Sequence, residues 1–316
     1  MTGGSVFSRI RYSIQEMEFR PSRIRLTLAL LIDPRWGYDL ASMAWLRLFK
    51  PLVPELSTLV DDANQTDATH SAGDSPLPFV LPFVALLAAP TLIGWLVPEA
   101  AKQVNSSGNP AVSTAFDVQA FLSALAQILI AGGILWWYRR VYLAVFPWRF
   151  SPWSLVLGLI GLILWVGLCR LGLESRLLQT VGLQGMLPQR PAVNPFESFA
   201  PGSVGWFLLF RFAVLMLVVP LAEELFVRGW LVRYLQAQEN WDIQPLATVG
   251  WAAQLGVIAY AVMTHPQEAV AAIAWFGLVN WWMKRTGNFW DCVLVHAVTN
   301  GLLGAWILYS GDWRLW

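Results

Sequence analysis

Long apolar segments dominate this chain and constrain its fold more than any other feature. A helix needs roughly twenty predominantly apolar residues to cross a bilayer. Seven segments approach or reach that length, near Leu77–Val97, Val118–Tyr138, Trp153–Cys169, Val204–Leu221, Leu246–Met263, Glu268–Met283 and Trp290–Tyr309. We therefore predict an all-α fold, a polytopic transmembrane helical bundle with about seven to eight spans.

The composition agrees with a membrane protein, because 56% of the residues are hydrophobic and only 13% are charged. Many of the 19 Trp residues stand near the ends of apolar segments, among them Trp95, Trp148 and Trp290, as in interfacial aromatic belts. The formal net charge of +1 comes without the clustered basic surface that phosphate binding requires. We expect the lipid bilayer as the surroundings and no nucleic acid among the partners.

The part of the chain before the first predicted span has a different character. Trp36–Val53 mixes apolar and charged residues, which favours a helix that lies in the membrane interface. Asp61–Pro76 is rich in Asp, Ser, Thr, Gly and Asn and is expected to be a polar linker. We therefore predict an N-terminal cytoplasmic or interfacial region at 1–76 and a transmembrane core at 77–316.

Two adjacent carboxylates, Glu223 and Glu224, follow Pro220, which is expected to bend the helix just before them. A charged side chain near the bilayer centre costs roughly 2.5 to 3.5 kcal/mol on insertion scales, so acids there usually have a function. On a helix Glu224 and Arg228 share one face, whereas Glu223 points about 100° away. An acid turned toward an apolar cavity is suited to be a general base, so we assign that role to Glu223. An interfacial Glu-Arg pair that closes a helix is the structural alternative.

The apolar C-terminal half also contains two of the three histidines. His296 and Asn300 are four residues apart on one predicted helix and share a face, and His265 ends another apolar segment. A Glu and a His together can activate water, and a second His with an Asn can donate to the oxyanion that forms. The pattern indicates a hydrolytic site without a serine or cysteine nucleophile. For any single histidine, a core residue bonded to a backbone carbonyl is the structural alternative, and His70 in the linker is expected to be inert.

The order of these motifs resembles a known family. Glu223-Glu224-x-x-x-Arg228, then His265, then His296-x-x-x-Asn300 on successive apolar helices is similar to the CPBP family of intramembrane proteases, which includes the CAAX prenyl endopeptidases. The resemblance covers about 204–309. The family usually has Phe four residues before its second-motif histidine, whereas this chain has Ala261 there and Tyr260 one residue earlier. A CAAX protease-related subgroup found with bacterial exosortase systems is an expected closer relative.

The resemblance implies a role for each matching residue. Glu223 would activate water with the help of His265. Glu224 and Arg228 would hold the site together, and His296 and Asn300 would bind the oxyanion. Two His and two Glu would serve zinc, but an Asn is a poor zinc ligand and a good amide donor. We therefore expect a glutamate-dependent mechanism without a cofactor, and a metal-dependent mechanism is the alternative.

From these residues we expect an intramembrane endopeptidase that is multi-pass in the bacterial inner membrane. Its substrate partner would be a membrane protein or a lipidated peptide. The alternative function is a non-catalytic membrane scaffold or a carrier that uses intramembrane carboxylates.

Overall fold

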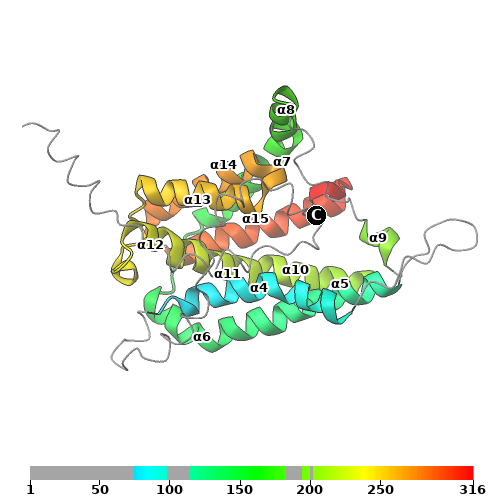
Figure 1. The fold of residues 1–316 in the computed structure, drawn as a ribbon, viewed down its shortest axis with the longest axis horizontal. Helices are drawn as coiled ribbons and strands as arrows, with labels where there is room; N and C mark the ends of the chain where they lie inside the picture. Colours follow the sequence, from blue (N-terminus) through cyan, green and yellow to red (C-terminus); the bar gives the residue numbers. More distant parts are fainter. Residues whose placement is uncertain (1–74, 98–113, 183–193, 200–201, 316) are drawn as a thin grey trace, which may run out of the picture. The chain divides into compact units, whose positions relative to one another are not determined.

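The computed structural model describes residues 75–97, 114–182, 194–199 and 202–315, and every regular element in these ranges is a helix. The predicted interfacial helix at Trp36–Val53 and His70 lie outside the described residues. Almost all of the predicted linker at Asp61–Pro76 lies outside them too, so the division at 76 and 77 stays a prediction. Within the described residues, the predicted all-α polytopic helical bundle is confirmed (Figure 1).

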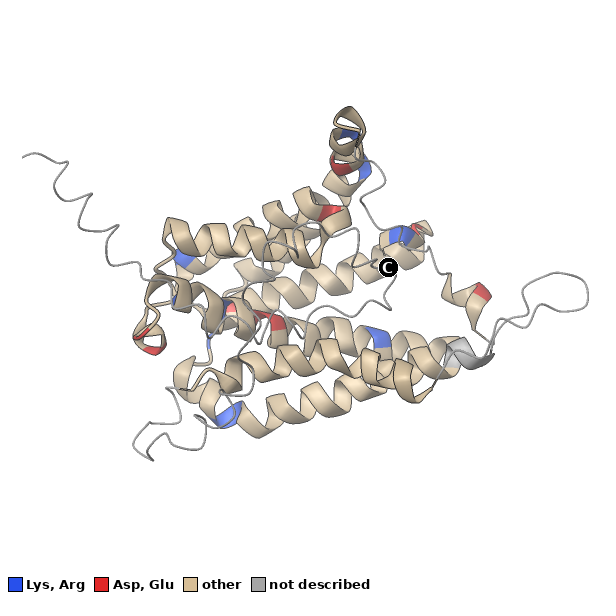
Figure 2. Cartoon of the chain, viewed as in Figure 1, with Lys and Arg blue, Asp and Glu red and all other residues tan. Residues whose placement is uncertain are grey.

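Among the residues that the structure describes, five helices are long and apolar enough to cross a membrane. They are α4 (Leu77–Leu96), Val118–Val145, Trp153–Thr180, Val204–Gln236 and α15 (Phe289–Ser310). The second is formed by the end of α5 (Thr114–Ala126), η4 (Gln127–Ala131) and α6 (Gly132–Val145). The third is formed by α7 (Trp153–Leu171) and α8 (Leu173–Thr180). Each begins within one residue of the start of a predicted span, but Val118–Val145, Trp153–Thr180 and Val204–Gln236 extend well beyond the predicted ends. Figure 2 shows few charged residues along these helices, as a hydrocarbon environment requires.

The other two predicted spans are also helical but do not meet the same criteria. The first, α13 (Trp251–Thr264), has 14 residues and is apolar but short. The second, α14 (Ala269–Thr286), has 18 residues and carries Lys284 and Arg285 in its last turn. Short turns connect these elements, namely α9 (Pro195–Ser198), η8 (Trp241–Ile243), η9 (Pro266–Glu268) and, after α15, η10 (Trp313–Leu315).

The sequence sets several helix ends through glycine and asparagine. The helices α7, α14 and α15 end at Gly172, Gly287 and Gly311, whose φ angles of 56°, 59° and 69° place them in the left-handed region that favours glycine. At the start of α15 the Asn288 side chain accepts a hydrogen bond from the backbone N–H of Trp290. These local signals fix where α15 begins and therefore which of its residues enter the bundle.

The helix at Val204–Gln236 carries the paired acids and is irregular around them. It consists of α10 (Val204–Ala213), η6 (Val214–Val218), α11 (Val219–Glu224), η7 (Leu225–Leu231) and α12 (Val232–Gln236), in which η6 and η7 are π-helical. Thus α11, with Pro220 and both glutamates, lies between two widened turns, a feature that often marks functional sites. Pro220 has no N–H to donate to the preceding turn. The chain stays helical through it, and the predicted bend remains a prediction.

The helix α15 runs through the middle of the bundle. It contacts α7, α14, α11 and η6, and Figure 1 shows it between the α13–α14 pair and the helix that contains α10 and α11. Small residues on α7 allow α15 to approach it closely. The hydroxyl of Thr299 of α15 therefore reaches the carbonyl of Gly158 and donates to it at 3.1 Å. The same hydroxyl accepts from the Trp275 indole of α14 at 3.3 Å. Three helices are therefore tied together at Thr299.

Replacing Gly161 with alanine is expected to destabilise this contact by about 1–3 kcal/mol through overpacking. A Cβ there would lie 2.6 Å from Thr299 Oγ1 and 2.9 Å from Trp275 Nε1. Thermal unfolding in detergent measures the effect. Gly167→Ala on the same helix is the matched control, since its Cβ would meet nothing within 4 Å. Equal unfolding temperatures for the two variants would contradict the predicted packing.

Candidate active site

Glu224 and Arg228 form a fully buried ion pair at the centre of the site. Arg228 Nη1 lies 2.9 Å from Glu224 Oε1, so the pairing predicted from their spacing is confirmed. The guanidinium also donates from Nε to Asn280 Oδ1 at 3.2 Å and from Nη2 to the Phe276 carbonyl at 3.3 Å. Asn280 in turn donates to Gln254 at 2.9 Å. Because both acceptors are on α14, the arginine anchors the long helix to α14 at the level of the acids.

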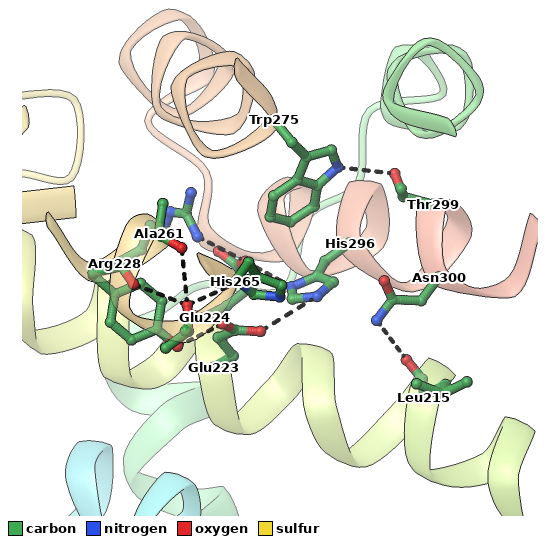
Figure 3. A network of polar contacts seen from close by, with 12 residues as sticks. Leu215, Glu223, Glu224, Arg228, Ala261, His265, Trp275, His296, Thr299 and Asn300 are labelled. Atoms are coloured by element: carbon green, nitrogen blue, oxygen red, sulfur yellow. Dashed lines mark hydrogen bonds and ion pairs between the residues drawn. The ribbon is translucent and has the colours of Figure 1, made fainter. Parts of the chain in front are cut away.

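His296 lies between the two glutamates (Figure 3). Its Nδ1 is 2.9 Å from Glu224 Oε1, and its Nε2 is 3.5 Å from Glu223 Oε2. The ring of Trp275, a residue of α14, lies edge-to-face against the imidazole with 4.6 Å between the ring centroids, and it restricts the movement of the imidazole. Residues more than 70 positions apart in the sequence thus form one polar cluster between α11 and α15.

Apart from His296, which contacts both acids, Glu223 has neighbours different from those of Glu224, as the helix geometry predicts. Its Oε1 accepts a hydrogen bond from the hydroxyl of Tyr260 at 2.5 Å, and the residue is 7% exposed. Sequence reasoning did not include Tyr260 among the site residues. The available signal was its place near the end of an apolar segment, five positions before His265.

His265 ends α13 and lies among aromatic side chains. Its ring centroid is 5.3 Å from that of Trp165 and 6.1 Å from that of Phe276. Its Nδ1 is 2.8 Å from the hydroxyl of Thr264. The Phe276 ring centroid also lies 4.9 Å from Cζ of the Arg228 guanidinium, so one aromatic ring contacts both His265 and the arginine of the buried ion pair.

Asn300 lies one turn beyond His296 on α15. Its Nδ2 donates to the carbonyl of Leu215 at 3.0 Å (Figure 3). Leu215 belongs to the π-helical η6, so the amide joins α15 to the long helix on the N-terminal side of the acids. Since an amide nitrogen carries two donors, one N–H of Asn300 is still available for a substrate.

Comparison with known proteins decides the family. Residues 205–302 match the family model described as Type II CAAX prenyl endopeptidase Rce1-like. The chain carries a domain of the CPBP/CAAX protease family. The matched range contains all six predicted site residues, from Glu223 to Asn300. No curated protein and no solved structure matches the chain.

The CAAX protease domain lies within an integral membrane protein. Large apolar side chains remain exposed on the outer faces of the helices, including Leu129, Ile163, Leu209 and Leu217. Such exposure is expected where lipid rather than water surrounds the bundle. The acids and His296, by contrast, are buried inside it.

A cavity of about 680 Å³ lies apart from the acids of the CAAX protease domain, among the connections after α6, α12 and α14. Its lining includes Arg233 and Asp291. Asp291 Oδ1 accepts from the backbone N–H of Ser151 at 2.6 Å, and Arg233 donates to the carbonyls of Gly229, Asp242 and Gln244. The buried charges of this cavity therefore hold the connecting loops in place.

Glu224→Leu is expected to destabilise the CAAX protease domain by about 3–5 kcal/mol, because it leaves Arg228 buried without its carboxylate. Thermal unfolding of the purified protein in detergent measures the loss. Arg314→Gln is the control, since it breaks a 2.9 Å ion pair with Asp312 in which the arginine is exposed, and should cost less than about 1 kcal/mol. If both variants unfold at the wild-type temperature, Glu224 does not stabilise the buried arginine.

Proposed function

We propose that the chain is an intramembrane endopeptidase that hydrolyses a peptide bond of a membrane-associated substrate with glutamate-activated water. One observation carries the proposal: His296 stands between two buried glutamates from another helix, inside a domain of the CAAX protease family. Carboxylates and an imidazole in contact are among the groups that carry out general acid–base hydrolysis.

Glu223 is the acid best placed to be the general base. Glu224 is fully buried, and its Oε1 is already shared by Arg228 and His296. Glu223 retains slight exposure and contacts Tyr260 and His296, so Oε2 is available to take a proton from water. The other oxygen of Glu224 has no hydrogen-bond partner among the described residues, and such buried polar atoms are often found at functional sites.

Thr264 orients the imidazole of His265 for a supporting role. Its hydroxyl is 2.9 Å from the Tyr260 carbonyl and 2.8 Å from His265 Nδ1. A hydroxyl has one proton, and we assign it to the carbonyl, so Nδ1–H of His265 donates to Thr264. In this tautomer Nε2 is the basic nitrogen of the His265 ring.

His296 and Asn300 would stabilise the oxyanion. The 3.5 Å distance from His296 Nε2 to Glu223 exceeds the usual hydrogen-bond distance of about 2.7–3.2 Å, so this nitrogen can serve a substrate oxygen. As the water oxygen bonds to the substrate carbonyl carbon, Glu223 accepts the water proton. The carbonyl oxygen becomes an oxyanion that receives hydrogen bonds from Asn300 and from Nε2–H of His296. In this step His296 carries a proton on both ring nitrogens, because Nδ1–H donates to Glu224. When the C–N bond breaks, Glu223 returns the proton to the leaving amine.

The donor set does not fit a catalytic metal. The described residues contain no group of three or more His, Cys, Asp or Glu side chains placed to hold one. Glu224, the most buried acid, directs Oε1 at the positively charged Arg228, which disfavours a second cation at that oxygen. We therefore derive no step through a metal.

The substrate class follows from the position of the site. Glu223 and His296 belong to helices long enough to span a bilayer, so a peptide must reach them from the membrane or its surface. We propose a membrane protein or a lipidated peptide as the substrate, and the bacterial inner membrane as the location.

Glu223→Gln is expected to abolish hydrolysis while the protein remains folded, because the amide cannot accept the water proton. The assay follows cleavage of an internally quenched peptide ending in a prenylated CAAX sequence, together with thermal unfolding. Glu239→Gln, at an exposed position, is the control and should be fully active. Near-wild-type turnover by Glu223→Gln would remove this residue from the base role.

Asn300→Ala separates the protease from a carrier. Loss of an oxyanion donor is expected to lower the rate of peptide cleavage about 10²-fold or more. The hydrogen bond to Leu215 is lost as well, so unfolding is measured in parallel. Asn240→Ala at an exposed position is the control. Unchanged cleavage in folded Asn300→Ala would argue against the oxyanion site and favour the scaffold or carrier.

A further inference from the structure

We propose that Tyr260 is the positioning residue of Glu223, and this inference rests on the proposed function. The Tyr260 hydroxyl donates to Glu223 Oε1 at 2.5 Å. Both residues are nearly enclosed, with exposures of 8% and 7%. By occupying Oε1, the hydroxyl leaves Oε2, the oxygen on the His296 side, as the one that receives the water proton.

The ring of Tyr260 is held from three sides, so the place of its hydroxyl does not depend on Glu223. Its centroid lies 5.9 Å from Phe83 of α4, 5.7 Å from Phe226 of η7 and 5.4 Å from Phe276 of α14. Such packing leaves the tyrosine little rotational freedom. The glutamate, which has several rotatable bonds, is the mobile partner and adopts the orientation that the hydroxyl selects.

The contact also divides the two carboxylate oxygens of Glu223 between different partners. Oε1 of Glu223 is held by the Tyr260 hydroxyl, and Oε2, which faces His296 Nε2, is the oxygen that reacts with water. Tyr260 thus acts through Glu223 without touching the substrate.

Tyr260→Phe tests this role because it removes the hydroxyl and keeps the ring. We expect kcat for the quenched prenylated CAAX peptide to fall about 10-fold to 100-fold with KM nearly unchanged, since a small displacement of a catalytic group costs rates of that size. Tyr142→Phe is the matched control, because the Tyr142 hydroxyl is also buried but donates to the Pro78 carbonyl at 2.6 Å. It should leave kcat unaltered.

A second readout does not require a substrate. Loss of the Tyr260 hydroxyl frees Glu223 Oε1, so labelling of Glu223 by a hydrophobic carbodiimide, measured by mass spectrometry, should rise at least about threefold in Tyr260→Phe. Glu224 serves as the internal reference and should keep its wild-type labelling, because Arg228 and His296 still hold it. Tyr142→Phe should leave the labelling of both acids unchanged.

The outcomes separate the two proposals. Unchanged Glu223 labelling and unchanged kcat in Tyr260→Phe would make Tyr260 a packing residue only and overturn the inference. Increased labelling in Tyr260→Phe, with no peptide cleaved by the wild type, would support the positioning contact and count against the proposed protease activity.

Discussion

The buried ion pair between Glu224 and Arg228 is the interaction on which the rest of the site depends. A charge in an apolar interior is tolerated only when it is paired and its remaining donors are bonded. Arg228 meets this condition by bonding Glu224 on its own helix and the side chain of Asn280 and the carbonyl of Phe276 on α14. Glu224 then shares the same oxygen with His296 of α15. One arginine thereby brings three helices together where the polar groups lie.

Small and aromatic residues hold the remaining side of the site. Gly158 and Gly161 let α7 approach α15, and Thr299 bonds across that contact. The indole of Trp275 donates to Thr299 and lies edge-to-face against His296. The packing of α7 therefore reaches the imidazole through two side chains, which links the stability of the bundle to the orientation of a candidate catalytic group.

Sequence reasoning found the parts of the site that depend on helix geometry alone. The spacing of Glu224 and Arg228 predicts their contact, because residues four apart share a face whatever surrounds the helix. It also predicts that Glu223 has other neighbours. Tyr260 and Asn280 were missed, since no local pattern shows which side chains on α13 and α14 face the acids. Their partners lie 37 and 52 positions away in the chain.

By itself the sequence determined where the helices lie and which polar residues must be enclosed, because apolar length and the cost of charge in lipid act locally. It overestimated α13, which has only 14 helical residues. The tertiary structure decided that His296 contacts both acids and that one N–H of Asn300 donates to the Leu215 carbonyl. It also decided that the Tyr260 hydroxyl donates to Glu223. These contacts arise from the packing of separate helices, so residue spacing along any one helix does not predict them.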